Sequence, residues 1–212
     1  MRRGWFISFE GGDGSGKSTQ IKRLAESLSG LGHEVILTRE PGGTDISEKI
    51  RDILLDKENR AMTPVTEAML YAAARAQLVG EVIRPAVEAG KVVICDRFLD
   101  SSIAYQSFGR QLGDMVEVIN AYGIDGCMPD LTIFLKLDPA RGRQRIGSRE
   151  KDRIEEESSD FHRRVAEGYD RLEREHPDRI LAVDASGTIE DIAETILRAV
   201  TGRLFGGAGD EV

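Results

Sequence analysis

Residues 11–18 read GGDGSGKS, which matches the pattern G-x-x-x-x-G-K-[ST] of a phosphate-binding loop. Glycines let backbone N–H groups approach phosphate oxygens, and the helix that follows adds the positive end of its dipole. We expect Lys17 to reach the β- and γ-phosphates of a nucleotide and the Ser18 hydroxyl to bind Mg²⁺. The loop is therefore predicted to bind ATP, through Gly11, Gly12, Asp13, Gly14, Ser15, Gly16, Lys17, Ser18 and Thr19.

Asp13 is an unusual residue inside an anion-binding loop. A carboxylate among phosphates is unfavourable unless a cation or a hydrogen-bond donor neutralises it. Asp13 can hold part of a Mg²⁺ shell or orient a phosphoryl acceptor, or it can simply form a turn before Gly14. The residues alone leave these readings open.

Two further segments place arginine at the end of a predicted strand. Asp96 and Arg97 follow one apolar run, and Arg39 ends another. Ligands of open α/β sheets bind at the carboxyl ends of the strands, where a carboxylate suits Mg²⁺ and arginine suits phosphate. The alternative for Asp96 and Arg97 is a solvated ion pair. Two arginines facing a phosphate loop favour a second phosphate site, which a kinase with a phosphorylated acceptor needs and a simple NTPase does not.

Two other segments carry candidate chemistry with a strong alternative. Tyr71 and Arg75 are four residues apart on one predicted helix, where they can hold a flat base or can be a core aromatic beside an extended arginine. Residues 141–164 are rich in arginine and acids. They form either a solvated, salt-bridged helix pair or a lid, about residues 141–160, that brings an arginine to the transferred phosphoryl group.

Short apolar runs alternate with segments of helical spacing along the whole chain. The strands are predicted at residues Trp5–Phe9, Val35–Thr38, Val92–Cys95, Leu131–Leu137 and Ile180–Val183. Between them we expect helices, including one after the loop that stops near Gly30, one that begins at Thr63 and Pro64, and one behind Thr188. Pro85 should break or kink the second of these. This alternation predicts βαβ units and a buried parallel sheet.

Composition excludes several classes of protein. The 212 residues are 40% hydrophobic and 31% charged, which excludes a disordered chain, and no apolar run is long enough to cross a membrane. The net charge of −8 argues against a general nucleic-acid partner. Two cysteines form no disulfide framework, which favours a cytoplasmic setting. Residues 1–201 are expected to form one domain, and the patternless residues 202–212 a disordered tail.

Seven segments together resemble the bacterial thymidylate kinase family of P-loop nucleoside monophosphate kinases. They are FEGGDGSGKST, TREPGGT, YAAARAQL, DRF, SSIAYQ, PDLTIFL and DRIEEES, and they span about residues 5 to 200. The resemblance implies a three-layer P-loop NTPase fold of the α/β class, with a five-stranded parallel sheet flanked by helices and a helical lid. It also implies a homodimer.

The resemblance assigns roles to individual positions. Lys17, Asp13, Arg97 and Arg149 would be catalytic, with Arg145 and Arg153 as rivals to Arg149 for the lid arginine. Ser18 and Asp96 would support the metal. The acceptor dTMP would be bound by Arg39 and Arg97 at its phosphate, by Tyr71 and Arg75 at the base, and by Ser101, Ser102, Tyr105 and Gln106 along the base and sugar.

The implied reaction is ATP + dTMP → ADP + dTDP, with Mg²⁺, a phosphotransferase step toward dTTP synthesis. The nearest alternative is another kinase of the same fold, acting on dUMP or on a deoxynucleoside, because one methyl group distinguishes thymine from uracil. A nucleotide-binding switch ATPase is the alternative from another class. It would need no second-phosphate arginines.

Overall fold

The chain folds around one parallel sheet of five strands. In the computed structural model, which describes residues 3–147 and 152–206, the strand order is β2-β3-β1-β4-β5. The strands are β1 (Trp5–Glu10), β2 (Val35–Arg39), β3 (Val92–Asp96), β4 (Leu131–Lys136) and β5 (Ile180–Asp184). All four pairings are parallel. The five predicted strands and the α/β class are therefore confirmed, with ends that differ by one residue.

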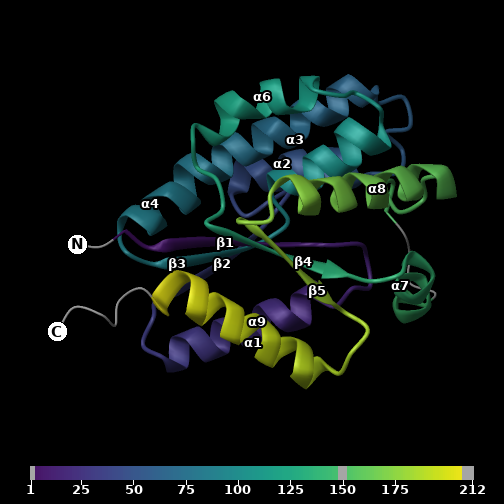
Figure 1. Cartoon of the computed structure of the whole chain (residues 1–212). Coiled ribbons are helices and arrows are strands. Elements are labelled where there is room, and N and C mark those ends of the chain that lie inside the picture. The colour runs from purple at the N-terminus through teal and green to yellow at the C-terminus, as the bar shows by residue number, and fades with distance from the viewer. Residues whose placement is uncertain (1–2, 148–151, 207–212) are drawn as a thin grey trace.

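Helices cover both faces of the sheet and give three layers. In Figure 1, α1 and α9 lie below the sheet, and α2, α3, α4, α6 and α8 lie above it. The α-helices are α1 (Lys17–Gly30), α2 (Asp45–Leu55), α3 (Pro64–Leu78), α4 (Arg84–Glu88), α5 (Leu99–Ser102), α6 (Met115–Ile124), α7 (Pro139–Ile146), α8 (Ser159–Glu175) and α9 (Ile189–Val200). Three wider π-type turns are η1 (Val79–Ile83), η2 (Ile103–Gly109) and η3 (Thr201–Phe205).

The helix starts follow local capping rules. The Thr63 hydroxyl accepts a hydrogen bond from the Thr66 N–H, and Pro64 occupies the first turn of α3, where a missing N–H costs nothing. Thr188 caps α9 in the same way. Pro85 does not break the helical path, since the chain continues from α3 through η1 into the first turn of α4. In place of the expected break, the helix widens into the π-type turn η1 just before the proline.

Each face of the sheet has its own apolar core, because successive side chains of a strand point to opposite faces. Ile7 and Phe9 of β1 pack in the cluster under α1 and α9, which includes Leu28. Phe6 belongs to the cluster on the other face. Burial on both faces explains why the strands read as continuous apolar runs.

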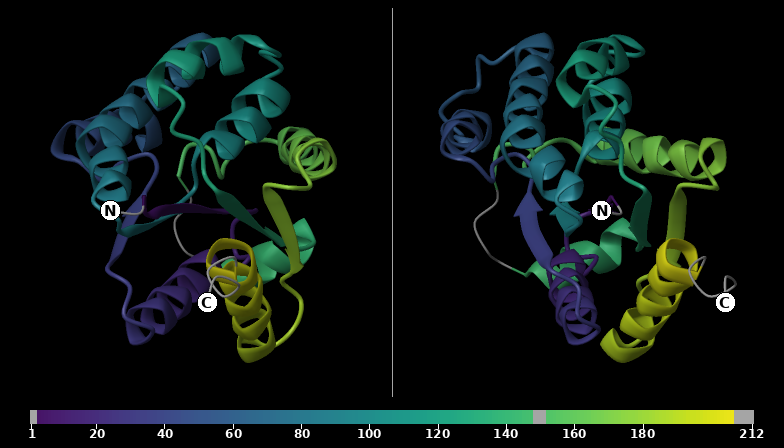
Figure 2. Two further views of the ribbon diagram at one scale, coloured as in Figure 1. Left: turned by 60° about the vertical axis from the view of Figure 1, so that its left-hand side comes forward. Right: turned by 90° about the vertical axis from the view of Figure 1, so that its left-hand side faces the viewer.

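The tail prediction is wrong for its first residues. Residues 201–205 form the turn η3, and Leu204 is buried in the core cluster beside α9. The Phe205 ring stacks on His33 with centroids 4.3 Å apart. Residues 207–212 of the predicted tail lie outside the described part of the chain. Figure 2 shows α9 beside α1.

No helix within the described residues is long and apolar enough to span a membrane.

Candidate active site

The phosphate loop joins β1 to α1 at the carboxyl end of the sheet. Gly11 has φ +137°, and a Cβ atom there would lie 2.6 Å from the Leu135 carbonyl oxygen, so only glycine fits. The Lys17 ammonium donates to the Gly11 and Gly12 carbonyl oxygens, at 3.0 and 3.2 Å. Burial, with the charge of Arg97 as a second cause, lowers the pKa of Lys17 to about 8.

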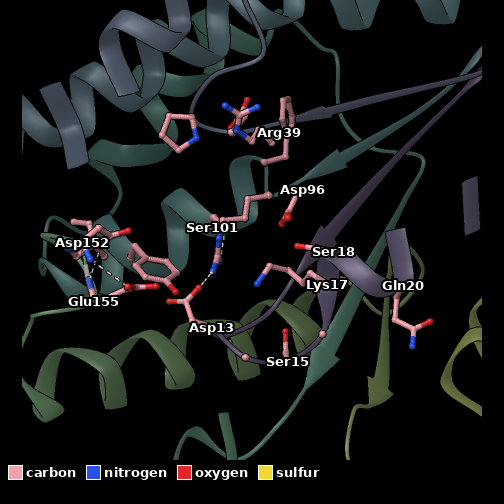
Figure 3. A pocket seen from close by; sticks show the side chains of 18 of the residues that line it. Asp13, Ser15, Lys17, Ser18, Gln20, Arg39, Asp96, Ser101, Asp152 and Glu155 are labelled. Atoms are coloured by element: carbon pink, nitrogen blue, oxygen red, sulfur yellow. Dashed lines mark hydrogen bonds and ion pairs between the residues drawn. The ribbon is translucent and has the colours of Figure 1, made fainter. Parts of the chain in front are cut away.

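The loop forms one wall of a cavity of about 860 Å³. Figure 3 shows Lys17 and Ser18 pointing into it, with the Asp96 carboxylate near the Ser18 hydroxyl in this view. Nearly all the predicted site residues line this one cavity: Asp13, Gly14, Ser15, Gly16, Lys17, Ser18, Thr19, Arg39, Tyr71, Arg75, Asp96, Arg97, Ser101, Ser102, Tyr105 and Gln106. Segments that are far apart in the sequence therefore come together in one cavity, as the motifs predicted.

Asp13 and Arg97 form an ion pair across the cavity. Arg97 Nη2 lies 2.8 Å from Asp13 Oδ1, and its Nη1 is 3.2 Å from the hydroxyls of both Ser101 and Tyr169. The guanidinium also lies 5.3 Å from the centroid of the Tyr105 ring. The side chain of Arg97 is 18% exposed, which excludes the solvated ion pair considered for it. Asp13 is therefore more than a turn former.

Asp96 offers a carboxylate suited to a cation. Its Oδ1 is buried and has no hydrogen-bond partner among the described residues. A buried carboxylate oxygen without a donor favours a metal ion or a metal-bound water. The described residues contain no cluster of three or more His, Cys, Asp or Glu that could hold a metal. The donors Asp96 and Ser18 fit a Mg²⁺ ion that takes its other ligands from phosphates and water.

Arg75 is buried at the other end of the cavity and held from several sides. Its Nη2 lies 2.5 Å from Glu40 Oε2, and both side chains are at most 3% exposed. Its other partners are Asn120 at 2.5 Å, Ser102 at 3.0 Å and the Phe98 carbonyl oxygen at 3.2 Å. Burial raises the pKa of Glu40 to about 7, although the Arg75 charge opposes this. The guanidinium is thus fixed in position.

Arg39 and Tyr71 are placed differently from Arg75. The Arg39 side chain is half exposed and pairs with Glu48 Oε2 at 2.8 Å, so it is more exposed than Arg75 and Arg97. Tyr71 keeps its aromatic plane in the cavity lining, one helical turn before Arg75. Burial raises the pKa of its hydroxyl, which therefore stays protonated at neutral pH.

Glu10 is a site residue that the sequence analysis missed. This buried carboxylate accepts hydrogen bonds from the Phe98 N–H at 2.8 Å, the Ser101 hydroxyl at 2.6 Å and the Tyr169 hydroxyl at 2.9 Å. Burial and the nearby charge of Asp100 raise its pKa to about 7. A charged residue at the end of an apolar strand, directly before Gly11, was the available signal. Glu40, which follows Arg39 in the segment TREPGGT, carried a similar signal, whereas Asn120 and Tyr169 carried none.

The arginines predicted for a lid are only partly described. Arg149 lies in residues 148–151, outside the described part of the chain. Arg145 lines the cavity and donates to the Ala185 carbonyl oxygen at 3.0 Å. Arg153 pairs with Glu67 at 2.8 Å and donates to the Leu54 carbonyl oxygen. Arg153 is therefore engaged with α2 and α3, away from the phosphate loop.

The sequence matches a known family over most of its length. The family model described as thymidylate kinase matches residues 9–196. The chain belongs to the thymidylate kinase family. Its relatives include the thymidylate kinase of Thermoanaerobacter sp. (strain X514), 49% identical over 93% of this chain and 98% of the relative. The thymidylate kinase of Bacillus pumilus (strain SAFR-032) is 46% identical over 95% and 97%.

A solved thymidylate kinase has the same fold. The crystal structure of the enzyme from Ehrlichia chaffeensis superposes with a TM-score of 0.77 and 31% identity, covering 94% of this chain and 99% of that one. The resemblance inferred from the motifs is therefore confirmed, and with it the P-loop NTPase fold. Membership of the thymidylate kinase family accounts for a cavity that joins a phosphate loop to a second set of arginines.

Proposed function

We propose that this cavity transfers the γ-phosphoryl group of ATP to dTMP, giving ADP and dTDP for dTTP synthesis. The observation that carries the proposal is the placement of Arg97 and Arg39 in the same cavity as the phosphate loop. One anion site faces another, as a nucleoside monophosphate kinase requires. Family membership makes dTMP the acceptor.

The donor end holds ATP through the phosphate loop, residues 11–19, with Lys17 on the β- and γ-phosphates. Mg²⁺, when bound, neutralises charge on these phosphates, and Ser18 and Asp96 are the residues that would hold it. An oxygen of the dTMP phosphate attacks the γ-phosphorus, the bond to the β-phosphate oxygen breaks, and ADP leaves. The attacking oxygen is already an anion, so the residues act by positioning and charge stabilisation.

The acceptor end binds dTMP through residues of several elements. Arg97, held by Asp13 and Ser101, and the more exposed Arg39 take the phosphate. Tyr71 stacks on the thymine ring, and Arg75 donates to it. The remaining contacts to base and sugar come from Ser101, Ser102, Tyr105 and Gln106. Arg149 is proposed as the lid arginine that reaches the transferred phosphoryl group.

The working form is proposed to be a cytoplasmic homodimer. Large apolar side chains are exposed on the outer helices: Ile46 and Ile53 on α2, Val65 and Met69 on α3, and Val118 and Tyr122 on α6. These helices lie side by side on the outer layer (Figure 1), where a second copy can cover them. Cys95 and Cys127 are free thiols, which suits a reducing compartment.

The test is coupled ADP release with ATP and Mg²⁺, comparing dTMP, dUMP, ribothymidine monophosphate, thymidine and no acceptor. Turnover highest with dTMP supports the proposal. Turnover with thymidine would instead make the protein a nucleoside kinase and remove Arg39 and Arg97 from an acceptor phosphate. ATP hydrolysis at the same rate with and without an acceptor would indicate a switch ATPase.

One variant, measured with both substrates, separates the two ends of the cavity. Arg97→Ala should raise the KM for dTMP and lower kcat by about two orders of magnitude or more, because a buried phosphate ligand is lost. The KM for ATP should change much less. An equal loss at both substrates would contradict the assignment of Arg97 to the acceptor.

A further inference from the structure

A cluster of charged side chains lies directly behind the base end of the cavity, with Glu67 of α3 at its centre. Glu67 Oε1 accepts from Gln106 Nε2 at 3.0 Å and from Arg110 Nε at 3.1 Å. Its Oε2 lies 2.8 Å from both Arg110 Nη2 and Arg153 Nη1. The Glu67 side chain is 1% exposed. Four N–H donors therefore surround one buried carboxylate.

Glu67 is ionised at neutral pH. Burial alone would raise its pKa, but the hydrogen bonds from Arg110 and Gln106 and the charge of Arg153 lower it below the ordinary value. An ionised carboxylate only accepts hydrogen bonds. The amide of Gln106 must therefore turn its NH₂ group toward Glu67, and its carbonyl oxygen faces away from that carboxylate.

Gln106 is 1% exposed and lines the cavity together with Tyr71 and Arg75. A carbonyl oxygen presented there can accept a hydrogen bond but cannot donate one. Thymine and uracil carry an N–H donor at ring position 3, beside the O4 acceptor, whereas cytosine carries an acceptor at position 3 and an amino group at position 4. Arg75 is a fixed donor whose buried Nε has no hydrogen-bond partner among the described residues. The Arg75 donor suits the O4 acceptor of thymine or uracil, and the Gln106 carbonyl oxygen suits their N3–H. Cytosine would place an amino group against the donor and an acceptor against the carbonyl oxygen.

We propose that Glu67 is a positioning residue that makes the enzyme select pyrimidines with an N3–H group, by fixing the orientation of the Gln106 amide. This rests on the proposed function, because it takes the base of the acceptor nucleotide to lie against Gln106. Glu67 touches no substrate and acts only through Gln106. Arg110 and Arg153 keep the carboxylate charged and in place. Through Arg153, the predicted lid segment therefore contributes to base selection.

The deciding variant is Glu67→Gln. Its amide can donate to Gln106 as well as accept from Arg110, so the Gln106 amide becomes free to turn over. We expect the ratio of kcat/KM for dTMP to that for dCMP to fall by about tenfold or more, since one buried hydrogen bond is then mismatched. The ratio for dTMP to dUMP should stay unchanged, because both bases carry N3–H.

Glu157→Gln is the matched control. Glu157 also pairs with Arg110, at 2.5 Å, so this variant removes one negative charge from the same arginine. Because Glu67 still holds the Gln106 amide, the dTMP to dCMP ratio should remain at the wild-type value. A loss of structure around Arg110, in contrast, would change both variants alike.

Gln106→Met gives a second route that leaves Glu67 intact. It removes the amide at nearly constant volume, and we expect the same fall in the dTMP to dCMP ratio. Adding Glu67→Gln to Gln106→Met should lower the ratio no further, because the residue through which Glu67 acts is gone. If Glu67→Gln does not fold, Glu67→Asp decides in its place, because it keeps the negative charge beside Arg110 and Arg153 but shortens the side chain away from Gln106, and the dTMP to dCMP ratio should again fall.

The outcomes separate this proposal from the one before it. A wild-type enzyme without dTMP turnover overturns the proposed function. A wild-type dTMP kinase whose dTMP to dCMP ratio is unmoved by Glu67→Gln or by Gln106→Met overturns only the role of Glu67. A fall of equal size in Glu157→Gln would also overturn it, because the effect would then come from Arg110.

Discussion

Arg75 and Arg97 reach the cavity from different elements, and each is fixed by a carboxylate. Glu40 holds Arg75, and Asp13 holds Arg97. A guanidinium fixed in this way loses little side-chain entropy when a ligand arrives. The carboxylates also prevent several positive charges from repelling one another in a small volume. At the scale of residues, the site is therefore organised as arginine–carboxylate pairs.

Lys17 should make ATP binding depend on pH. Its pKa of about 8 means that the free protein loses the ammonium charge as the pH rises from 7 to 9. Bound phosphates favour the charged form, so its pKa rises in the complex and ATP binding takes up a proton. The Kd for ATP should therefore increase by about tenfold over this range. Isothermal titration calorimetry in buffers of different ionisation enthalpy measures both quantities.

Lys17→Arg is the control for that measurement. Arginine stays protonated at all these pH values, so the variant should bind ATP with no proton uptake near pH 8 and a flatter pH profile. Equal proton uptake in both proteins would show that another group titrates. The proton linkage of ATP binding would then not belong to Lys17.

At the scale of elements, the parts that local rules determine were predictable. The strand positions followed from apolar runs, and the start of α3 followed from a threonine cap before a proline. The π-type turns η1 and η2 were not predictable, because their sequences are ordinary helix sequences and the widening depends on packing. The break expected at Pro85 was wrong, because Pro85 lies in the first turn of α4, where a missing N–H is tolerated.

The same distinction between local sequence rules and tertiary packing applies to the site. Motif residues such as Lys17 and Arg97 were found because their chemistry requires a fixed spacing along the chain. Other buried residues of the site were missed because they come from distant parts of the chain. Tyr169 contacts Glu10 from 159 residues away, and Asn120 contacts Arg75 from 45 residues away. Contacts of that kind depend on tertiary packing and leave no local pattern. For this reason, the contacts of Glu67 could not be predicted from the sequence.

The element η3 gives a prediction about stability. Leu204 is 6% exposed and packs in the core cluster that includes Leu28 and Val200. Leu204→Ala should lower the free energy of unfolding by about 2–4 kcal/mol, because it leaves a cavity between the helices. Urea denaturation followed by circular dichroism measures the change. Arg203→Ala, an exposed neighbour in the same turn, should cost less than about 1 kcal/mol. Similar losses in the two variants would mean that Leu204 is not part of the core.

At the scale of the whole molecule, α3 connects the cavity to the outer surface. One side of this helix carries Glu67 and Arg75, which are buried at the base end of the cavity. Another side carries Met69, which is 53% exposed between the exposed apolar residues of α2 and α6. A second copy that covered Met69 would therefore pack against the same helix whose Arg75 is proposed to bind the base. Dimerisation and acceptor binding are expected to be linked through α3.

Met69→Lys tests this link. A charge at the centre of the apolar surface should shift the protein from dimer to monomer, measured by size-exclusion chromatography with light scattering. The KM for dTMP should rise severalfold in the monomer, because α3 loses its outer support, while the KM for ATP stays near the wild-type value. Leu31→Lys is the matched control, since Leu31 is 61% exposed at the end of α1 under the other face of the sheet. A monomeric wild-type protein would overturn the dimer, and a monomeric variant with an unchanged KM for dTMP would leave the dimer but remove its link to the base pocket.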